Sequence, residues 1–294
     1  MVYEQVVTIS NSFWTYFLRI KFNWIFMLSE AGLRIGIFVT ALVVMMIWEA
    51  SKPNRTSAVA NSKRWRTNFF LVLCGAVVGR LVVPAGLAVV ALFAAKHNVG
   101  LLLFIQGAMP NWISILLGVL LLDCLIYWQH RLFHRVPLLW RLHRVHHADP
   151  HLDASTGLRF HPIEIALSLL VKATAILLLG VPVEAVLIFE IVLNASSIFN
   201  HSNIKLPNYV EWPLRKLIVT QAMHRIHHSQ VAAETDSNFG FSLSLWDRLF
   251  GSYCKNASAG DAGLTLGLKE YSKEQNNTGI LTVLLMPFRK TPQD

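Results

Sequence analysis

Long apolar segments with few charges constrain the fold of this chain more than any other feature. A helix needs about 20 mostly apolar residues to cross a bilayer. The stretch 68–95 is long enough to do so although Arg80 and Pro84 interrupt it. We therefore predict an all-α integral membrane helical bundle with about four to five spans, drawn from residues 31–48, 68–95, 112–128, 163–181 and 183–199.

Composition agrees with a membrane protein and argues against a nucleic-acid partner. The chain is 54% hydrophobic and only 15% charged, with a net charge of +9, whereas globular chains are about 25% charged. Since the apolar segments are at odds with a nucleic-acid-binding protein, we expect no nucleic-acid partner and assign the excess cations to loops beside a membrane. Residues 12–28 mix aromatics with Arg19 and Lys21 and predict an interfacial helix. No basic region precedes them, so we expect no cleaved signal peptide.

Loop charges predict the orientation of the spans. Residues 49–67 carry five Lys and Arg, whereas residues 96–111 carry only Lys96. Cytoplasmic loops collect cations, so the first loop is expected in the cytoplasm, and the following spans return the chain there at His130 and again at His201. We predict three regions: residues 1–64, with the interfacial helix, the first span and the basic loop; a central domain at 65–255, with a cytoplasmic-side helical cap; and a tail at 256–294.

Histidines gather in three short motifs, "HRLFH", "HRVHH" and "HRIHH". In a helix, residues three or four apart share a face, so each motif is expected to direct its imidazoles toward one point. Imidazole binds iron, zinc, copper and nickel. Eight such ligands are too many for one ion and suit two. The eight are His130, His134, His143, His146, His147, His224, His227 and His228.

Polar residues extend two of these helices into the apolar spans. Asp123, Tyr127, His130 and His134 follow each other at helical spacing, as do Glu190, Asn194, Ser197 and His201. His201 is therefore a ninth candidate ligand. Asp123 and Asn194 are candidate catalytic residues that orient ligands, a role that metal sites generally need. Asp123 could instead be a structural partner of Arg80. Further candidates for contact with ligands are Tyr127, Glu190 and His161; the last could also simply precede a helix.

Three other kinds of site are weighed against a centre for two metal ions. Haem is disfavoured because the histidines flank the spans and CxxCH is absent. A zinc hydrolase is disfavoured because HExxH is absent. A metal transporter or other non-enzymatic metal-binding protein should carry its ligands near the middle of the membrane, whereas these lie at one edge. Trp246 could belong to the core or line the site.

These motifs resemble those of the fatty acid hydroxylase / sterol desaturase superfamily. The likeness rests on "HRLFH", "HRVHH", "FNHSN" and "HRIHH" in that order, with "DCLIYWQH", "LRFHPIE" and "NFGFSLSLWDRLFGSY" around them. The ending is similar to the alkylglycerol monooxygenase-like and bacterial sterol-desaturase-like branches. The resemblance implies two non-haem iron ions held by the nine histidines, O2 as co-substrate, a separate electron-transfer protein or reductase, and hydroxylation or desaturation of a membrane lipid. An ether-lipid or carotenoid monooxygenase is the alternative within the superfamily.

Overall fold

The computed structural model describes residues 30–56, 61–106, 109–273 and 277–290. The chain divides into two compact units, Met1–Thr40 and Ala41–Asp294. In the first unit residues 30–40 are helical, and Arg34 Nη1 lies 3.2 Å from Glu30 Oε1. The interfacial helix predicted at 12–28 lies outside the described residues. The contacts and sites that follow are all in the second unit.

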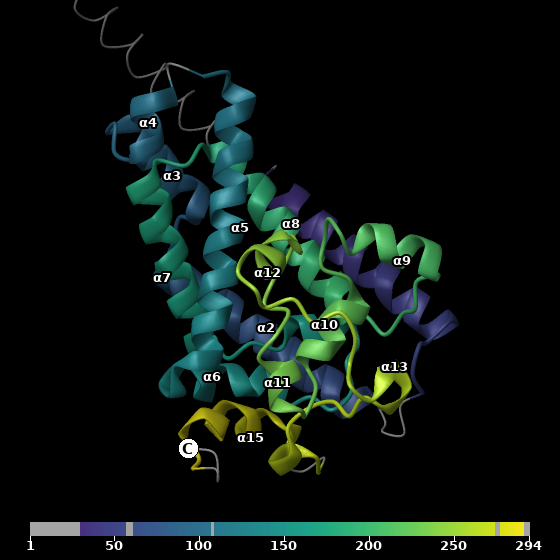
Figure 1. The fold of residues 1–294 in the computed structure, drawn as a ribbon. Coiled ribbons are helices and arrows are strands. Elements are labelled where there is room, and N and C mark those ends of the chain that lie inside the picture. The colour runs from purple at the N-terminus through teal and green to yellow at the C-terminus, as the bar shows by residue number, and fades with distance from the viewer. Residues whose placement is uncertain (1–29, 57–60, 107–108, 274–276, 291–294) are drawn as a thin grey trace, which may run out of the picture. The chain divides into compact units, whose positions relative to one another are not determined.

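The second unit is built from helices (Figure 1). The longer or more apolar ones are α2 (Asn61–Val82), α3 (Leu87–Lys96), α4 (Leu101–Gln106), α5 (Asn111–Arg135), α7 (Pro162–Leu179) and α8 (Val183–His201). The others are α6 (Pro137–His147), η1 (Ala154–Leu158), α9 (Asn208–Leu214), α10 (Gln221–His227), α11 (Ala232–Thr235), α12 (Leu245–Leu249), α13 (Gly260–Gly263), η2 (Lys269–Tyr271), α15 (Ile280–Leu285) and η3 (Met286–Phe288). Among the described residues β pairing is limited to isolated bridges, Ile218–Leu243 and Ser229–Leu266. The predicted all-α class is confirmed.

Five helical segments of the described chain are long and apolar enough to cross a membrane, as predicted. They are Glu30–Ser51, Ser62–Lys96, Asn111–Arg135, Pro162–Leu179 and Val183–His201. The stretch predicted at 112–128 is the first part of a longer helix, α5, whose last two turns carry the first histidine motif. The segment Ser62–Lys96 is interrupted at residues 83–86, between α2 and α3. Pro84 lacks the backbone N–H that a continuous helix needs there.

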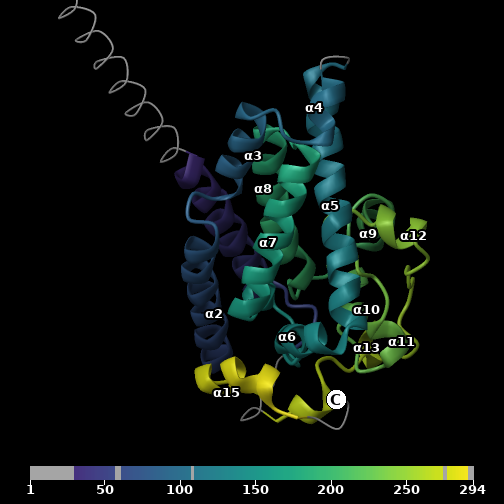
Figure 2. The same cartoon turned by 90° about the vertical axis from the view of Figure 1, so that its left-hand side faces the viewer.

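The apolar helices pack into a bundle around a core shared by α3, α5, α7 and α8. Leu122 and Ile126 of α5 lie against Ile176 of α7 and Phe189 of α8, all of them buried. Figure 2 shows α5, α7 and α8 running alongside one another, with α2 and α3 beside α7. Outward-facing residues such as Leu81, which is 74% exposed, remain uncovered. This exposure is expected of helices whose outer faces meet lipid.

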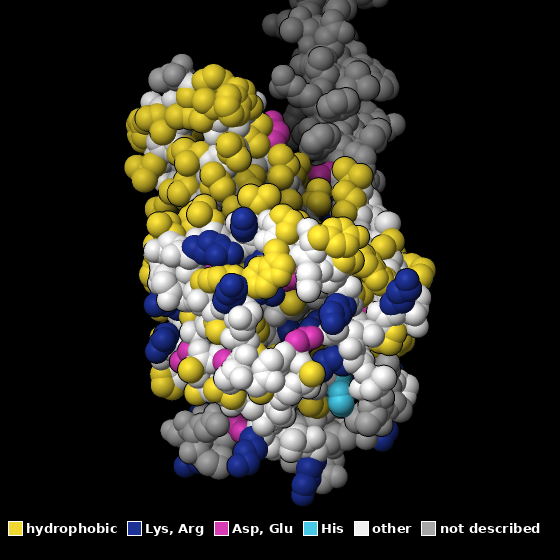
Figure 3. Space-filling view, turned by 45° about the vertical axis from the view of Figure 1, so that its right-hand side comes forward, with side chains coloured by type: hydrophobic (Ala, Val, Ile, Leu, Met, Phe, Trp, Pro, Cys, Tyr) yellow, Lys and Arg dark blue, Asp and Glu magenta, His cyan; other side chains and the backbone are white. Residues whose placement is uncertain are grey.

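Short helices and the C-terminal segment form a cap at one end of this bundle. The end of α5 turns directly into α6, and α10, α11, α13 and α15 lie at the same end (Figure 1). Val145 of α6, Leu71 of α2, and Val283 and Met286 of the C-terminal segment share a second buried cluster. In Figure 3 hydrophobic side chains dominate the upper part of the face shown, and Lys and Arg side chains lie lower down.

A glycine allows η1 to approach α8 closely. A Cβ atom on Gly157 would lie 2.5 Å from the carbonyl oxygen of Ser197, nearer than side-chain atoms approach a backbone. Ser197 Oγ donates to Gly157 O at 2.8 Å in return. This contact holds the loop after α6 against the end of α8, where His201 lies.

Candidate metal centre

All nine candidate histidines meet in two adjacent groups within the cap. In each group every histidine offers one nitrogen, and these nitrogens lie within 4.8 Å of one another. The first group draws on α5, α6 and α10, and the second on α6, α8 and α10 together with the residue after α10. The first contains His130, His134, His143, His147 and His227; the second contains His146, His201, His224 and His228.

The structure corrects one expectation about the motifs. Each HxxHH motif was expected to direct its imidazoles toward one point, but each is divided between the two groups. His143 and His147 join the first group while His146 joins the second. Neighbouring residues in a helix diverge by about 100°, because a turn takes 3.6 residues. The side chains of consecutive histidines therefore point to two different places, and each motif supplies ligands to both groups.

The inward-facing nitrogens are arranged as metal ligands would be. His201 Nε2 lies 2.9 Å from His146 Nε2 and 3.0 Å from His224 Nε2. His134, His147 and His227 each have a buried Nε2 without a hydrogen-bond partner among the described residues. Ligand nitrogens about 2 Å from one ion lie within about 4 Å of each other. Small side-chain shifts would therefore let each group enclose an ion.

Four imidazoles are oriented by an acceptor on their outer nitrogen. His143 Nδ1 donates to Glu164 Oε1 at 2.7 Å. Nδ1 of the other three donates to a backbone carbonyl: His130 to Phe239 O at 2.8 Å, His201 to Ser197 O at 2.6 Å and His227 to Ser237 O at 2.8 Å. A carbonyl can only accept, so Nδ1 carries the proton in these three and Nε2 keeps the lone pair that a metal requires.

Burial keeps the cap histidines in the form that binds metal. It is the main reason that the pKa of His227 falls to about 3. The pKa values of His146 and His147 lie well below the usual 6.5, because of burial first and neighbouring imidazoles second. The same holds for His224 and His228. Neutral imidazole is the metal-binding state, so none of these five histidines has to lose a proton near neutral pH.

Asp123 and Tyr127 support the segment that lies beside the histidines. Asp123 Oδ2 accepts from Trp246 Nε1 at 2.8 Å and from Leu243 N at 3.2 Å. The sequence suggested Arg80 as an alternative partner of Asp123, but the contacts that the structure gives Asp123 come from the segment around α12. Tyr127 OH pairs with Ser252 Oγ at 2.8 Å. Both residues thus fix residues 243–252 against α5, and neither points into a histidine group.

The other candidates predicted to support the site lie apart from the histidines. Asn194 is exposed, and its amide donates to Glu190 O at 2.8 Å, one turn back along α8. Glu190 is buried in the same helix. His161 caps α7 by accepting from Ile163 N at 3.2 Å, and its Nε2 lies 3.2 Å from Leu284 O. The structure does not bring these three side chains to either group.

Two carboxylates that were not among the predicted site residues shape the centre. Glu164 is buried and bonds to His143, as described above. Asp247 accepts from Phe239 N at 2.7 Å and Gly240 N at 2.8 Å, and so holds the turn whose Phe239 carbonyl orients His130. The sequence did contain a signal for Glu164, since it lies two residues after "HP" in the first turn of a helix. Asp247 has no comparable signal, because only the tertiary fold brings it to residue 239.

Buried arginines anchor the segment between α6 and α7. Arg64 Nε donates to Asp149 Oδ1 at 2.9 Å and its Nη1 to Asp153 Oδ2 at 3.0 Å. Arg159 Nε donates to Val145 O at 2.7 Å. The Arg64 and Arg159 charges hold the pKa of Asp149 at about 2 despite its burial. Paired charges thus fix the segment that directly follows the histidines of α6.

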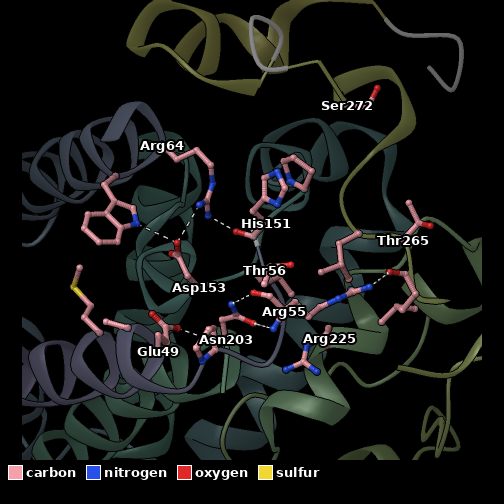
Figure 4. A pocket seen from close by; sticks show the side chains of 18 of the residues that line it. Glu49, Arg55, Thr56, Arg64, His151, Asp153, Asn203, Arg225, Thr265 and Ser272 are labelled. Carbon is pink, nitrogen blue, oxygen red and sulfur yellow. Dashed lines mark hydrogen bonds and ion pairs between the residues drawn. The ribbon is translucent and has the colours of Figure 1, made fainter. Parts of the chain in front are cut away.

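A polar pocket of about 800 Å³ lies next to this anchored segment (Figure 4). Glu49, Asp153 and Asn203 line one part of it, and Arg55 and Arg225 face them. Glu49 Oε1 accepts from the backbone of Ala154 at 2.7 Å and of Asn203 at 2.5 Å. None of the nine histidines lines this pocket, so it is separate from the two groups.

Comparison with known proteins bears directly on these histidines. Residues 115–252 match the family model described as fatty acid hydroxylase. This segment contains all nine. The resemblance inferred from the sequence motifs is confirmed.

Several curated proteins are similar to part of this chain. Ornithine lipid hydroxylase OlsE of Rhizobium tropici is 30% identical over 183 residues, covering 62% of this chain and 52% of that protein. Alkylglycerol monooxygenase of Homo sapiens is 29% identical over 148 residues, covering 49% and 30%. Lathosterol oxidase of Mus musculus is 27% identical over 178 residues, covering 58% and 57%. The chain therefore spans between 30% and 57% of the length of these relatives. No solved structure matches it.

Proposed function

We propose that this chain is a membrane-bound oxidoreductase that hydroxylates or desaturates a lipid, using O2 and two non-haem iron ions. The observation that carries the proposal is the pair of adjacent, buried histidine groups, one with five nitrogens and the other with four. The family match and the relatives' names, which include a hydroxylase, a monooxygenase and an oxidase of lipids, support the reaction class.

The donor set suits two transition-metal ions. Nine imidazoles supply nitrogen ligands, which favour iron, copper, zinc and nickel over magnesium or calcium. Two iron ions would supply the O2-dependent oxidation of an unactivated C–H bond, which side-chain acids and bases cannot perform.

The chain's own residues hold and orient those ligands. His130, His134, His143, His147 and His227 would hold one ion, and His146, His201, His224 and His228 the other. Glu164 and the carbonyls of residues 197, 237 and 239 fix the imidazole tautomers. Burial of the groups keeps bulk water away from the ligands.

The position of the centre suits a substrate that arrives from a bilayer. His130 and His134 lie in the last two turns of one candidate span, and His201 is the last residue of another. A lipid substrate could therefore reach the cap without leaving the membrane. The alternative within the family is an ether-lipid or carotenoid monooxygenase. The alternative from another class is a membrane metal-binding protein without enzymatic activity.

The remaining parts of the proposal concern orientation, electrons and domains. The cation-rich segment 49–67 supports a cytoplasmic location for the cap, by the rule that cytoplasmic loops are basic. Because the proposed reaction consumes electrons, a separate electron-transfer protein or reductase is the expected partner. We assign the oxygenase domain to residues 65–255, preceded by region 1–64 and followed by a tail at 256–294.

The test combines metal content with lipid products. Purified protein loaded with Fe(II) without oxygen should bind about two ions per chain, since the histidines form two groups. His146→Ala and His227→Ala each remove a ligand from a different group, so each should lower bound metal and abolish turnover. His97→Ala, which changes an exposed histidine outside both groups, should change neither.

Substrates are identified by comparing lipids from cells with and without the protein by mass spectrometry. Full metal content and full O2-dependent activity in folded His146→Ala protein would contradict the proposal. Two bound ions without any change in the lipids would favour the non-enzymatic alternative.

A further inference from the structure

A cluster of exposed apolar side chains lies on α9, on α12 and on the residues next to them. Both helices are far too short to span a bilayer. We call this cluster, with the nearby cations Lys216, Arg248 and Lys255, the α9–α12 surface. Its apolar members are Tyr209, Trp212, Leu217, Leu245 and Leu249, which are 81%, 41%, 67%, 47% and 63% exposed.

The two helices form one continuous surface. Ser244 Oγ donates to Arg215 O at 2.6 Å, and Arg215 Nη1 donates to Lys255 O at 2.7 Å. Lys255 Nζ lies 4.9 Å from the ring centre of Trp212. These contacts join residues that follow α9 to residues on both sides of α12. The exposed side chains of the two segments therefore belong to the same face.

Contacts with α5 place this surface at the level of a candidate span. Trp246 Nε1 donates to Asp123 Oδ2 at 2.8 Å, and the Phe250 ring lies 4.8 Å from the Trp128 ring. Asp123 lies inside the span Asn111–Arg135, about 18 Å before its end at 1.5 Å per residue. Figures 1 and 2 both show α12 beside α5, above α10 and α11. The α9–α12 surface therefore continues the apolar exterior of α5.

The charges on this surface have one sign. Lys216, Arg248 and Lys255 are exposed. The carboxylates of segments 208–218 and 245–255 are Glu211 and Asp247, which are only 7% and 0% exposed. Glu211 is already paired with Arg215 at 2.8 Å. The outward face thus combines aromatic and aliphatic side chains with exposed cations and no exposed carboxylate from these two segments, as amphipathic segments at anionic membrane surfaces do.

We propose that the α9–α12 surface is seated in the headgroup layer of an anionic phospholipid bilayer. Leu217, Leu245 and Leu249 face the boundary with the acyl chains, and the three cations face lipid phosphates. Trp212 and Tyr209 lie at the level where aromatic side chains collect in membrane proteins. The proposal concerns where the bilayer surface meets the chain, and it does not depend on a bound metal or on catalysis.

This seating fixes the distance between the bilayer surface and the histidines. His130 follows Asp123 by seven residues on α5, which corresponds to about 10 Å along the helix. The first histidine group would therefore lie about one helix diameter beyond the level of α12. A lipid would have to extend only a short part of its length out of the bilayer to reach it.

The test uses a fluorescent label and brominated lipids. In protein whose Cys74, Cys124 and Cys254 are replaced, Leu249→Cys carries a bimane group and the protein is placed in nanodiscs. Bromine quenches bimane only on contact, so brominated lipid should quench the label at 249. The control is the same label at Lys269→Cys, an exposed position on η2 in the cap, where we expect no quenching.

A second arm tests the charge of the lipid. Brominated phosphatidylglycerol should quench the label at 249 roughly twofold more than brominated phosphatidylcholine, because the cations attract anionic lipid. Lys216→Gln with Lys255→Gln should remove this preference while quenching itself persists.

Three results would overturn the proposal. The first is equal quenching at 249 and 269. The second is equal quenching by the two lipids before the lysines are changed. The third is a label at 249 that neither brominated lipid nor aqueous iodide reaches, which would assign the surface to a protein partner.

Discussion

Glu164 bonds to His143 at 2.7 Å, although the histidine spacing itself gives no hint of it. A carboxylate that accepts the outer N–H of a ligand imidazole fixes the ring and raises its basicity. His161 and Glu164 lie three residues apart in the same short motif, yet the structure places only the glutamate at the centre. The reason is geometric, because the imidazole of His161 is used to cap α7.

We predict that Glu164→Ala lowers the affinity of the first histidine group for metal by about 10–100-fold. Glu164→Gln, which retains an acceptor oxygen, should lose less metal affinity than Glu164→Ala. Metal titration of the purified protein measures both. Glu184→Gln, an exposed carboxylate at the start of α8, is the control. Unchanged affinity in Glu164→Ala would mean that the carboxylate has no effect on the site.

Asp247 makes stability depend on pH in a defined direction. Burial raises its pKa from 3.8 to about 6. The folded protein therefore holds a proton there that the unfolded chain releases, so this contribution to stability is full below pH 4 and is lost as the pH rises through 6. Its size is at most about 3 kcal/mol, at 1.36 kcal/mol per pKa unit.

We predict that the stability of the wild type relative to Asp247→Asn is greater at pH 5 than at pH 8. Asparagine does not titrate, so the variant lacks this contribution at both values. Thermal unfolding of both proteins at the two pH values in the same detergent gives the comparison. A difference in Tm that does not change with pH would contradict the assigned pKa.

At the scale of elements, Arg159 joins α6 and the C-terminal segment of the cap to α2. It is fully buried and donates to Val145 O on α6 at 2.7 Å, to Asn68 Oδ1 on α2 at 3.1 Å and to Asn277 O in the C-terminal segment at 2.5 Å. Burial lowers its pKa, to about 10, which leaves it charged at neutral pH. The C-terminal segment is thereby tied to the helix that carries three histidines.

Arg159→Met should destabilise the protein by roughly 3 kcal/mol or more, because it leaves three buried acceptors without a donor. It should also free the C-terminal segment for proteolysis. Thermal unfolding and limited proteolysis measure the two effects. Arg66→Met, at an exposed site on α2, is the control and should lie within about 0.5 kcal/mol of the wild type. Equal protease resistance in the two variants would contradict the role of Arg159.

Hydropathy predicted the membrane spans well, because a long apolar stretch such as 183–199 has no apolar environment other than the membrane. It ended the predicted span at residue 128 because "HRLFHR" is polar, whereas the helical spacing of Asp123, His130 and His134 already indicated that the helix continues to the end of this motif. The helix continues because the protein supplies partners for those side chains, such as Phe239 O for His130. Helical spacing likewise identified the histidines as candidate ligands. It did not show how they divide into two groups, because that depends on how α6 and α10 are oriented relative to each other.

At the scale of the whole molecule, the number of spans between two positions predicts whether they lie on the same side of the membrane. Ser62→Cys in the first turn of α2 and Lys269→Cys in the cap should react with a membrane-impermeant reagent from the same side. His97→Cys, after α3, should react only from the other side. All three positions are exposed, and the natural cysteines are replaced first. Reaction of positions 62 and 269 from opposite sides would contradict the arrangement of the spans.

The two histidine groups differ in how their members are distributed along the chain. Four of the five in the first group lie between residues 130 and 147, whereas only His146 of the second lies before residue 201. During synthesis, the first group would be nearly complete once α5 and α6 have emerged, while the second must wait for α10. Under the proposed metal binding, the two ions would be acquired in sequence. A ribosome-stalled chain ending near residue 215 would hold one ion and not two.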